Sequence, residues 1–506
     1  MSQRVAIIGA GPSGIVAAKF LQQEGLQTTL FEQSDQAGGQ WHVSNSLSGI
    51  WPGMPTNTSR IMTQFSDLDH LPELSAFPVV EEIQDYLQRY LDTFDLRKCL
   101  RLNCWVERIQ PDQSGTWSVI YRTAEGSTVQ ENFDFVLVAS GRFNQPFIPD
   151  VPGLPFPDDP NTLIEIYHSH QYMGPNVFKG KRVLLVGGAI SALEIASDLA
   201  LKSDVKVSIA YRGQRYVMKK AAQGVPTDHI NFSLYEALAA ERLSSDELAA
   251  KMRDFIVAEF GSPDEFGTPK PNEDVRIAGV TKCDHFLGLV AQKRIKVHPF
   301  ISRIEGNTVH FTDGSYAQFD AIIFATGYQL DMPFLRADEA QVIGLDSQHL
   351  GLYKNTFHPD LPGLTVAGFY NQVGPYFPVL ELQARWIAYV WSQKIESPGE
   401  DSMRKGLKEY LNSWKQQQKL PMHKLAMLFA RASGVEPDLE QWPDIARALW
   451  FGPLSASVFR LSGPDAVTDA HQKVHAAAQA FGMITEPFFT AAEKERLQSI
   501  SVRIAT

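Results

Sequence analysis

Two short apolar runs, each followed by a glycine-bearing turn and a helical pattern, organise this chain. They begin at residues 4 and 182, and each helical pattern leads into a further apolar run, TTLFEQ at 28–33 and VKVSIAY at 205–211. Strand, turn, helix and strand in this order predict a βαβ unit. The sequence therefore predicts an α/β protein with two Rossmann-like dinucleotide-binding domains.

Other elements fill the space between these two units. Residues 83–94 (IQDYLQRYLDTF) place apolar side chains at helical spacing, and alternating patterns at 100–109, 117–121 and 133–141 predict strands. Proline and glycine then cluster from residue 146 to residue 160. Such a cluster is typical of a linker between domains.

The sequence pattern after this linker predicts that the second domain is inserted within the first. Residues 218–290 lack a strand rhythm and contain a charged helical stretch, so we interpret them as an insertion in the second domain. The run FDAIIFATGY at 319–328 closes the second unit. We expect the first domain to span 1–165 and to resume at 326–506, which ends in a helical region. The second domain is expected to span 166–325.

Composition and charge exclude several classes of function. The 506 residues carry a formal net charge of −11, and nucleic-acid binding normally needs a basic patch. The three cysteines, Cys99, Cys104 and Cys283, are too few and uneven for a disulfide framework. The N-terminus has no signal-peptide pattern, and no window reaches the ~18 apolar residues that a membrane helix needs. We expect a cytoplasmic protein without a nucleic-acid or membrane partner.

The first turn, residues 9–14, follows the pattern G-x-G-x-x-G. Gly9 allows a tight turn, Gly11 lets the backbone approach a pyrophosphate at the helix N-terminus, and Gly14 permits close packing of helix on strand. Glu32, at the end of the next strand, can accept hydrogen bonds from ribose hydroxyls. Because an acid at this position excludes a 2′-phosphate, the first site is expected to bind FAD or NAD rather than NADP.

The second turn, residues 187–192, matches the pattern less well. It keeps Gly187, but Ala189 and Ala192 stand at the second and third glycine positions. Alanine is tolerated at the third position, and Ser191 could donate to a phosphate. A plain helix start is the alternative interpretation, but the preceding apolar strand favours a second dinucleotide site.

Arginine follows the second strand of this unit where an acid would bind ribose. Arg212 stands directly after Tyr211, and Arg215 is close behind. Arginine at this place can pair with a 2′-phosphate, so the second site is expected to prefer NADPH over NADH. Either residue could instead be an ordinary solvated arginine.

A longer series of motifs resembles the flavin-containing monooxygenases along nearly the whole chain. In chain order they are GAGPSG (9–14), GGQW (38–41), TNTS (56–59), HSHQY (168–172), GGAISA (187–192), FATGY (324–328), QARW (383–386) and FGPLSASVFRLSGP (451–464). The family's fingerprint, F-x-G-x-x-x-H-x-x-x-(F/Y), is half kept. His168 and Tyr172 match it, whereas Thr162 and Ile164 replace the phenylalanine and the glycine. We expect this departure to affect the local linker and fine catalytic behaviour rather than the fold.

The resemblance implies an enzyme that uses FAD, NADPH and O2 to oxygenate an amine nitrogen or sulfide sulfur of a small molecule through a C4a-hydroperoxyflavin. It implies a catalytic role beside the flavin for Asn57, whose amide both donates and accepts hydrogen bonds. A turn asparagine is the alternative, and His168 is as readily a linker histidine as a cofactor contact. No metal site is predicted. The cofactor-binding residues that the resemblance and the two turns imply are Gly9, Gly11, Pro12, Ser13, Gly14, Glu32, Gln40, Trp41, Thr58, Val106, Tyr172, Gly187, Ser191, Ala192, Arg212, Thr326 and Gln383.

Three other functions fit parts of the pattern. A Baeyer-Villiger monooxygenase acting on ketones shares the architecture, but its fingerprint usually ends in tryptophan rather than tyrosine. A disulfide reductase would use a cysteine pair just after the Gly-Gly of residues 38–39, and Cys99 and Cys104 lie elsewhere. A non-catalytic flavin-fold protein is disfavoured because both nucleotide sites are retained. Oligomeric state is open, with the insertion as a plausible contact surface for a homo-oligomer.

Overall fold

The computed structural model describes residues 2–45, 48–155, 162–346, 348–414 and 419–501. Its first sheet has five parallel strands in the order β22-β7-β1-β2-β3. The strands are β1 (Arg4–Ile8), β2 (Gln27–Phe31), β3 (Leu100–Arg101), β7 (Phe135–Val138) and β22 (Leu364–Val366). Because β22 comes from the C-terminal part of the chain, distant segments build this sheet together.

The second sheet is also parallel, with the order β16-β11-β10-β20-β9. Its strands are β9 (Glu165–His168), β10 (Arg182–Val186), β11 (Lys206–Ala210), β16 (Ile295–His298) and β20 (Ala321–Phe324). Two parallel sheets with crossover helices confirm the predicted α/β fold class.

Each sheet is covered by helices that bury apolar faces. In the first domain, α1 (Pro12–Gln23) packs against α10 (Phe377–Trp391), all of whose residues are buried. The predicted helix at 83–94 is present as α2 (Val80–Thr93). In the second domain, α3 (Ile190–Lys202) packs on β11 and beside α8 (Phe286–Ala291).

Small antiparallel sheets lie beside the two main sheets. One comprises β4 (Trp105–Pro111), β5 (Trp117–Arg122) and β6 (Thr128–Phe133). The other comprises β17 (Ile301–Glu305), β18 (Thr308–Phe311) and β19 (Tyr316–Gln318).

The chain passes between the domains along two segments that pair with each other. β8 (Gln145–Pro146) is antiparallel to β21 (Tyr328–Gln329). The outgoing and returning connections are therefore tied by backbone hydrogen bonds. The predicted linker at 146–160 begins in β8, but its residues 156–160 lie outside the described residues.

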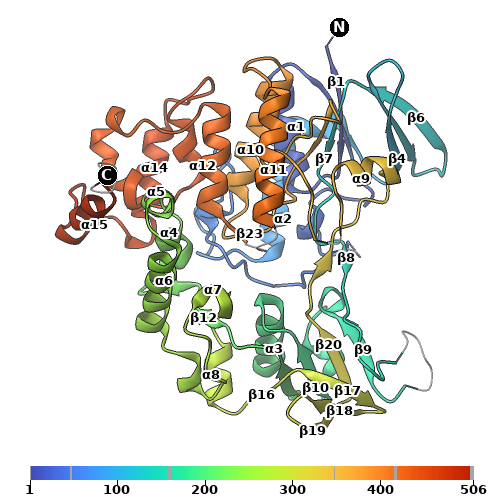
Figure 1. Cartoon of the computed structure of the whole chain (residues 1–506), viewed down its shortest axis with the longest axis vertical. Coiled ribbons are helices and arrows are strands. Elements are labelled where there is room, and N and C mark those ends of the chain that lie inside the picture. The colour runs from blue at the N-terminus through green and yellow to red at the C-terminus, as the bar shows by residue number, and fades with distance from the viewer. Residues whose placement is uncertain (1, 46–47, 156–161, 347, 415–418, 502–506) are drawn as a thin grey trace.

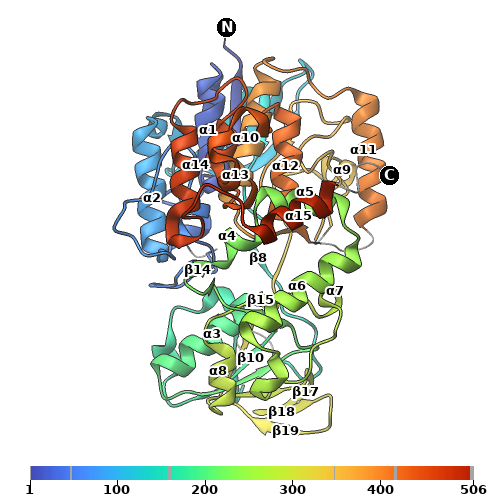
Figure 2. The same ribbon diagram turned by 90° about the vertical axis from the view of Figure 1, so that its left-hand side faces the viewer.

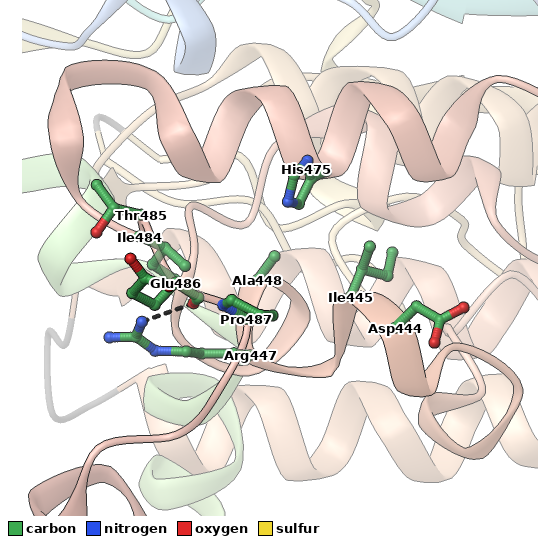
Figure 3. Close-up of a pocket in the computed structure, with 9 residues that line it drawn as sticks. All are labelled: Asp444, Ile445, Arg447, Ala448, His475, Ile484, Thr485, Glu486 and Pro487. Carbon is green, nitrogen blue, oxygen red and sulfur yellow. Dashed lines mark hydrogen bonds between the residues drawn. The ribbon is translucent and has the colours of Figure 1, made fainter.

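The predicted insertion lies between the second sheet and the C-terminal helices (Figures 1 and 2). It contains β12 (Tyr216–Met218), β13 (Ala221–Ala222), β14 (Val225–Pro226), α4 (Thr227–Asn231), α5 (Leu234–Arg242), α6 (Ser245–Phe260), α7 (Val275–Ala278) and β15 (Val280–Lys282). The sequence pattern did not predict these strands, each of which is two or three residues long. A strand this short gives no readable alternation.

The C-terminal region is helical, as expected, and packs on the insertion. α5 contacts α12 (Met422–Ser433), α13 (Ala446–Phe451) and α15 (Ala491–Ser501). The remaining elements there are α9 (Ala337–Val342), α11 (Glu400–Trp414), α14 (Ala470–Gln479) and the pair β23 (Gln372–Val373) and β24 (Leu420–Pro421). No described helix is long and apolar enough to cross a membrane.

A buried ionic cluster ties two of the sequence motifs together in this region. Arg385 of the QARW motif donates to Asp465 at 2.5 Å, and Arg460 donates to the other oxygen of the same carboxylate at 2.6 Å. All three side chains are 6% exposed or less. The FGPLSASVFRLSGP segment therefore closes over α10 through charge as well as apolar contact.

Candidate functional site

The first turn brings backbone groups together too closely for any side chain. A Cβ on Gly14 would lie 1.9 Å from the carbonyl oxygen of Gly9, and one on Gly9 would lie 2.7 Å from the carbonyl oxygen of Ala139. Gly9 also has φ +104°, a conformation that favours glycine. These distances explain why glycine is needed at positions 9 and 14, as the sequence predicts.

The start of α1 is open to an anion. Its N-cap is Gly11, which has no side chain to cap the free N–H groups, while Pro12 and Ser13 follow in the first helical turn. Gly39 of the GGQW motif faces Gly11, since a Cβ on Gly39 would lie 2.8 Å from the Gly11 Cα. Two glycines thus leave a cradle in front of the helix that fits a pyrophosphate.

Glu32, which the sequence predicts to bind ribose, keeps one acceptor position free. Its side chain is buried and accepts from the backbone N–H of Ala10 at 2.8 Å and from the N–H and hydroxyl of Ser34 at 2.9 and 2.8 Å. A carboxylate offers about four acceptor positions, so one position remains for a ligand hydroxyl. A free acceptor at this place would fit a ribose hydroxyl of FAD.

Several other predicted FAD residues act on the backbone around this cradle. Gln40 donates to the carbonyl oxygen of Phe143 at 2.9 Å. Gln383 is fully buried and accepts from the N–H of Gly368 at 2.9 Å, and a Cβ on Gly368 would lie 3.2 Å from the Ser13 hydroxyl. Gln383 therefore shapes the wall beside the first turn. Of the other two, Trp41 is half-buried against the core of the first domain and Val106 is buried in β4.

The second turn repeats the geometry of the first with more room. Gly187 has φ +137°, and its Cβ position lies 2.5 Å from the carbonyl oxygen of Ala325. The same position lies 3.5 Å from the Ala192 methyl, an ordinary van der Waals contact. Ala189 and Ser191 are exposed at the start of α3, whose N-cap makes no side-chain hydrogen bond. The alanines therefore leave this helix start accessible to a phosphate.

Two guanidinium groups lie beyond the second turn. Arg212 is exposed and stacks on the Phe300 ring at 4.6 Å, and burial lowers the pKa of Arg215. Within the described ranges, neither forms a salt bridge with a carboxylate. Thr326, also predicted, is half-buried and donates to the carbonyl oxygen of Phe147 at the crossing between the domains.

Asn57 lies where the insertion meets the first domain. Lys282, at the end of β15, donates to the Asn57 carbonyl oxygen at 3.1 Å. Asp228 of α4 accepts from the Ser59 N–H at 2.6 Å, and Thr58 bonds the hydroxyl of Thr63 at 2.8 Å. Within the described structure, the Asn57 Oδ1 is buried without a hydrogen-bond partner. The amide oxygen is thus left for a ligand.

Asp228 and Lys282 were not among the residues predicted from the sequence. No local pattern marks them, because their partners in the TNTS motif lie 169 and 225 residues away along the chain. Folding of the insertion against the first domain brings them together.

His168 and Tyr172 are both buried in the second domain. Burial, with help from the neighbouring His170, lowers the pKa of His168 to about 4, so the ring is neutral near pH 7. Tyr172 is 1% exposed and donates to Asp198 of α3 at 2.6 Å. This placement makes Tyr172 a support for α3, and direct contact with a cofactor stays a prediction.

The cysteines show no redox pair. All three are free thiols, and burial raises the pKa of both Cys99 and Cys104. Cys99 donates to the Leu96 carbonyl, whereas Cys104 packs in the core between β4 and the first sheet. A raised pKa makes a thiol unreactive.

Comparison with known families identifies the chain. Residues 2–496 match the family model for flavin-binding monooxygenase-like proteins. This protein belongs to that family. It is 30% identical over 488 residues to dimethylaniline monooxygenase [N-oxide-forming] 2 of Cavia porcellus, covering 92% of this chain and 89% of the relative. Human flavin-containing monooxygenase 2 is 29% identical over 519 residues, covering 98% and 95%.

Solved structures agree on the fold. The S-allyl-L-cysteine S-oxygenase of Allium sativum has a TM-score of 0.63 at 21% identity, covering 100% of this chain and 99% of its own. Cyclohexanone monooxygenase with bound ε-caprolactone reaches 0.65 at 17% identity, covering 86% and 98%. Since both kinds of oxygenase share the fold, the fold alone does not choose between them.

Family and site geometry together give the chemistry of the cofactors. The enzyme is a flavin-dependent monooxygenase that uses FAD and NADPH. The first turn and Glu32 would hold FAD, which would supply the redox chemistry that links NADPH to O2. The protein provides the cradle at the first turn and the polar side chains of the TNTS motif, residues 56–59.

Proposed function

We propose that this enzyme transfers one oxygen atom to an amine nitrogen or a sulfide sulfur of a small molecule. One atom of O2 enters the substrate, and the other leaves as water with the two electrons of NADPH and a proton. The observation that carries this proposal is the buried, unpartnered Oδ1 of Asn57 beside a backbone turn whose Asn57 carbonyl and Ser59 N–H are both hydrogen-bonded. Such an amide can hold a polar group of the cofactor or of the oxygen being transferred without giving up a bond within the protein.

The sequence relatives support the heteroatom over the ketone. Several relatives with about 30% identity are named as N-oxide-forming, and one structural neighbour is an S-oxygenase. The ketone-oxidising neighbour is similar in fold at 17% identity. Asn57 supplies an amide rather than an acid or base, which suits a reaction whose hard chemistry comes from the cofactor.

Arg212 and Arg215 of the second domain support a preference for NADPH over NADH. A 2′-phosphate near these guanidinium groups would gain charge-assisted hydrogen bonds. The cofactor-binding residues and the domain limits at 165 and 325 are part of the same proposal. A cytoplasmic location is proposed on the three free thiols, since a reducing compartment keeps thiols unpaired. A homo-oligomer joined through the insertion also stays a proposal.

The test supplies three substrates in parallel and follows where the oxygen goes. The purified enzyme receives NADPH, isotopically heavy O2 and either N,N-dimethylaniline, an alkyl sulfide or cyclohexanone, and products are identified by mass spectrometry. We expect heavy oxygen in an N-oxide or a sulfoxide. Lactone as the main product would replace this proposal with the Baeyer-Villiger reaction. Hydrogen peroxide as the sole product with every substrate would refute oxygen transfer to these classes.

A further inference from the structure

The second domain holds the TNTS turn, residues 56–59, at Asn57 and at Ser59. The Lys282 amine donates to the carbonyl oxygen of Asn57 at 3.1 Å, and the Asp228 carboxylate accepts from the N–H of Ser59 at 2.6 Å. Lys282 is 9% exposed and Asp228 is fully buried. Figure 2 shows α4 and β15, which carry them, between the upper body and the second sheet.

These two bonds fix the two peptide groups on either side of Thr58, directly after Asn57. A donor on the carbonyl oxygen of residue 57 and an acceptor on the N–H of residue 59 set the planes of two successive peptide groups. The first of these peptide groups, between residues 57 and 58, is one of the two that flank the Asn57 Cα. Holding it restricts the ψ angle of Asn57 and with it the direction of the Asn57 side chain. Rotating the turn would break one bond or both and leave a buried polar group unpaired.

A third hydrogen bond joins the insertion to the TNTS turn. His229, next to Asp228 on α4, bonds the Ser59 hydroxyl at 3.0 Å through Nε2. Burial lowers the pKa of His229 to about 4, so the ring stays neutral and can accept from the hydroxyl. Three consecutive contacts therefore join the insertion to a four-residue turn of the other domain.

A second buried lysine in the insertion has a different role. The Lys220 amine lies 3.6 Å from the Glu194 carboxylate of α3, within its own domain. Its backbone N–H donates to Asp284 at 2.7 Å, also within that domain. Burying a lysine is costly, and Lys220 shows that the insertion can do so without touching the TNTS turn.

We propose that Lys282 and Asp228 are positioning residues that orient Asn57 from the NADPH-binding domain. The inference rests on the proposed role of Asn57 in oxygen transfer and adds residues that act on it. Because both belong to the second domain, the Asn57 amide is correctly aimed when the domains stand as in this structure. The alignment of the oxygen-transfer site thereby depends on the domain that carries NADPH.

The first experiment compares Lys282→Met with Lys220→Met. For each, the product formed and the hydrogen peroxide released per NADPH consumed are measured, together with anaerobic FAD reduction by NADPH. We expect Lys282→Met to lower product per NADPH about tenfold, since misplacing a catalytic group by 1 Å can cost more than that. Its reduction rate should stay within about twofold of wild type. Lys220→Met should keep wild-type coupling, although its melting temperature falls.

The second experiment asks whether Lys282 acts through Asn57. Asn57→Ala removes the amide but keeps the carbonyl that Lys282 binds, so Lys282→Met in that background should add no further loss. The absorbance spectrum of bound FAD in Lys282→Met should shift toward that of Asn57→Ala. Asp228→Asn keeps the shape of the side chain and loses its charge, so it should lower product per NADPH in the same way but by less. It replaces Lys282→Met in the test if that variant fails to fold.

Each outcome decides a separate point. Wild-type coupling in both Lys282→Met and Asp228→Asn overturns the positioning role, as does a double variant whose losses multiply. The same loss in Lys220→Met would indicate general damage and also overturn it. If Asn57→Ala itself retains full coupling, the proposed role of Asn57 is refuted and the positioning role with it.

Discussion

Replacing Gly14 by alanine tests whether close backbone approach at the first turn holds the FAD site together. The new methyl would lie 1.9 Å from the Gly9 carbonyl oxygen and 3.3 Å from a Leu30 methyl. Ordinary C···O contacts are about 3.3 Å or longer, so α1 must move away from β1 by roughly 1.4 Å. Overpacking of this kind costs about 1–3 kcal/mol. Moving α1 also shifts the N–H groups that face the pyrophosphate.

The assay measures FAD content per polypeptide and melting temperature for Gly14→Ala beside Gly288→Ala. Gly288 is also helical, but its Cβ position has no atom within 4 Å. The same substitution there should stabilise the protein by about 0.5–1 kcal/mol, because glycine weakens a helix. We expect Gly14→Ala to lose most of its FAD and to melt several degrees lower. Wild-type FAD content and melting temperature would refute the packing argument.

Three further predictions concern charge. Arg212→Ala should raise the KM for NADPH about tenfold or more and leave the KM for NADH nearly unchanged, since a charged hydrogen bond is worth about 1.5–3 kcal/mol; equal effects on both would exclude 2′-phosphate contact. Asp465→Asn should destabilise the protein by about 3–5 kcal/mol in chemical denaturation, because Arg385 and Arg460 lose the buried carboxylate that pairs with both. An unchanged denaturation midpoint would contradict this. Burial opposes ionisation of Glu131, but hydrogen bonds, first from Arg101, lower its pKa from 4.5 to about 2. Its stabilisation is therefore present above about pH 4.5 and lost as the pH falls toward 2, and Glu131→Gln should flatten that part of the stability profile.

The first turn was predictable because each residue there has a local reason. Gly9 and Gly14 are required by contacts within six residues of chain and by the strand beside them. Glu32 follows at the end of the next strand, which the alternation of apolar residues already located. Residues that contact one another within a single βαβ unit can be predicted from the local sequence, because the unit packs on itself.

The second turn shows where a motif can weaken without losing its geometry. Ala192 replaces a glycine, yet its methyl group lies in ordinary contact with the Gly187 position, whereas the corresponding position in the first turn has no room for a methyl group. The space available at the third glycine position depends on how the helix packs on its sheet, which the sequence does not encode locally. His168 and Tyr172 were likewise found by motif order, but their burial behind α3 is a matter of tertiary packing.

The residues around Asn57 were beyond sequence reasoning for a further physical reason. Asp228 lies in a five-residue helix and Lys282 at the end of a three-residue strand, and neither element has a readable period. Their function depends on the partner surface, because a buried lysine and a buried aspartate are stable when each finds a complementary group. The complementary groups here are a carbonyl and an N–H of the other domain's turn. Main-chain groups carry no sequence signature, so a contact between a side chain and a distant backbone leaves no trace in either segment. A site assembled in this way at a domain boundary is found by following the hydrogen bonds of the motif outward.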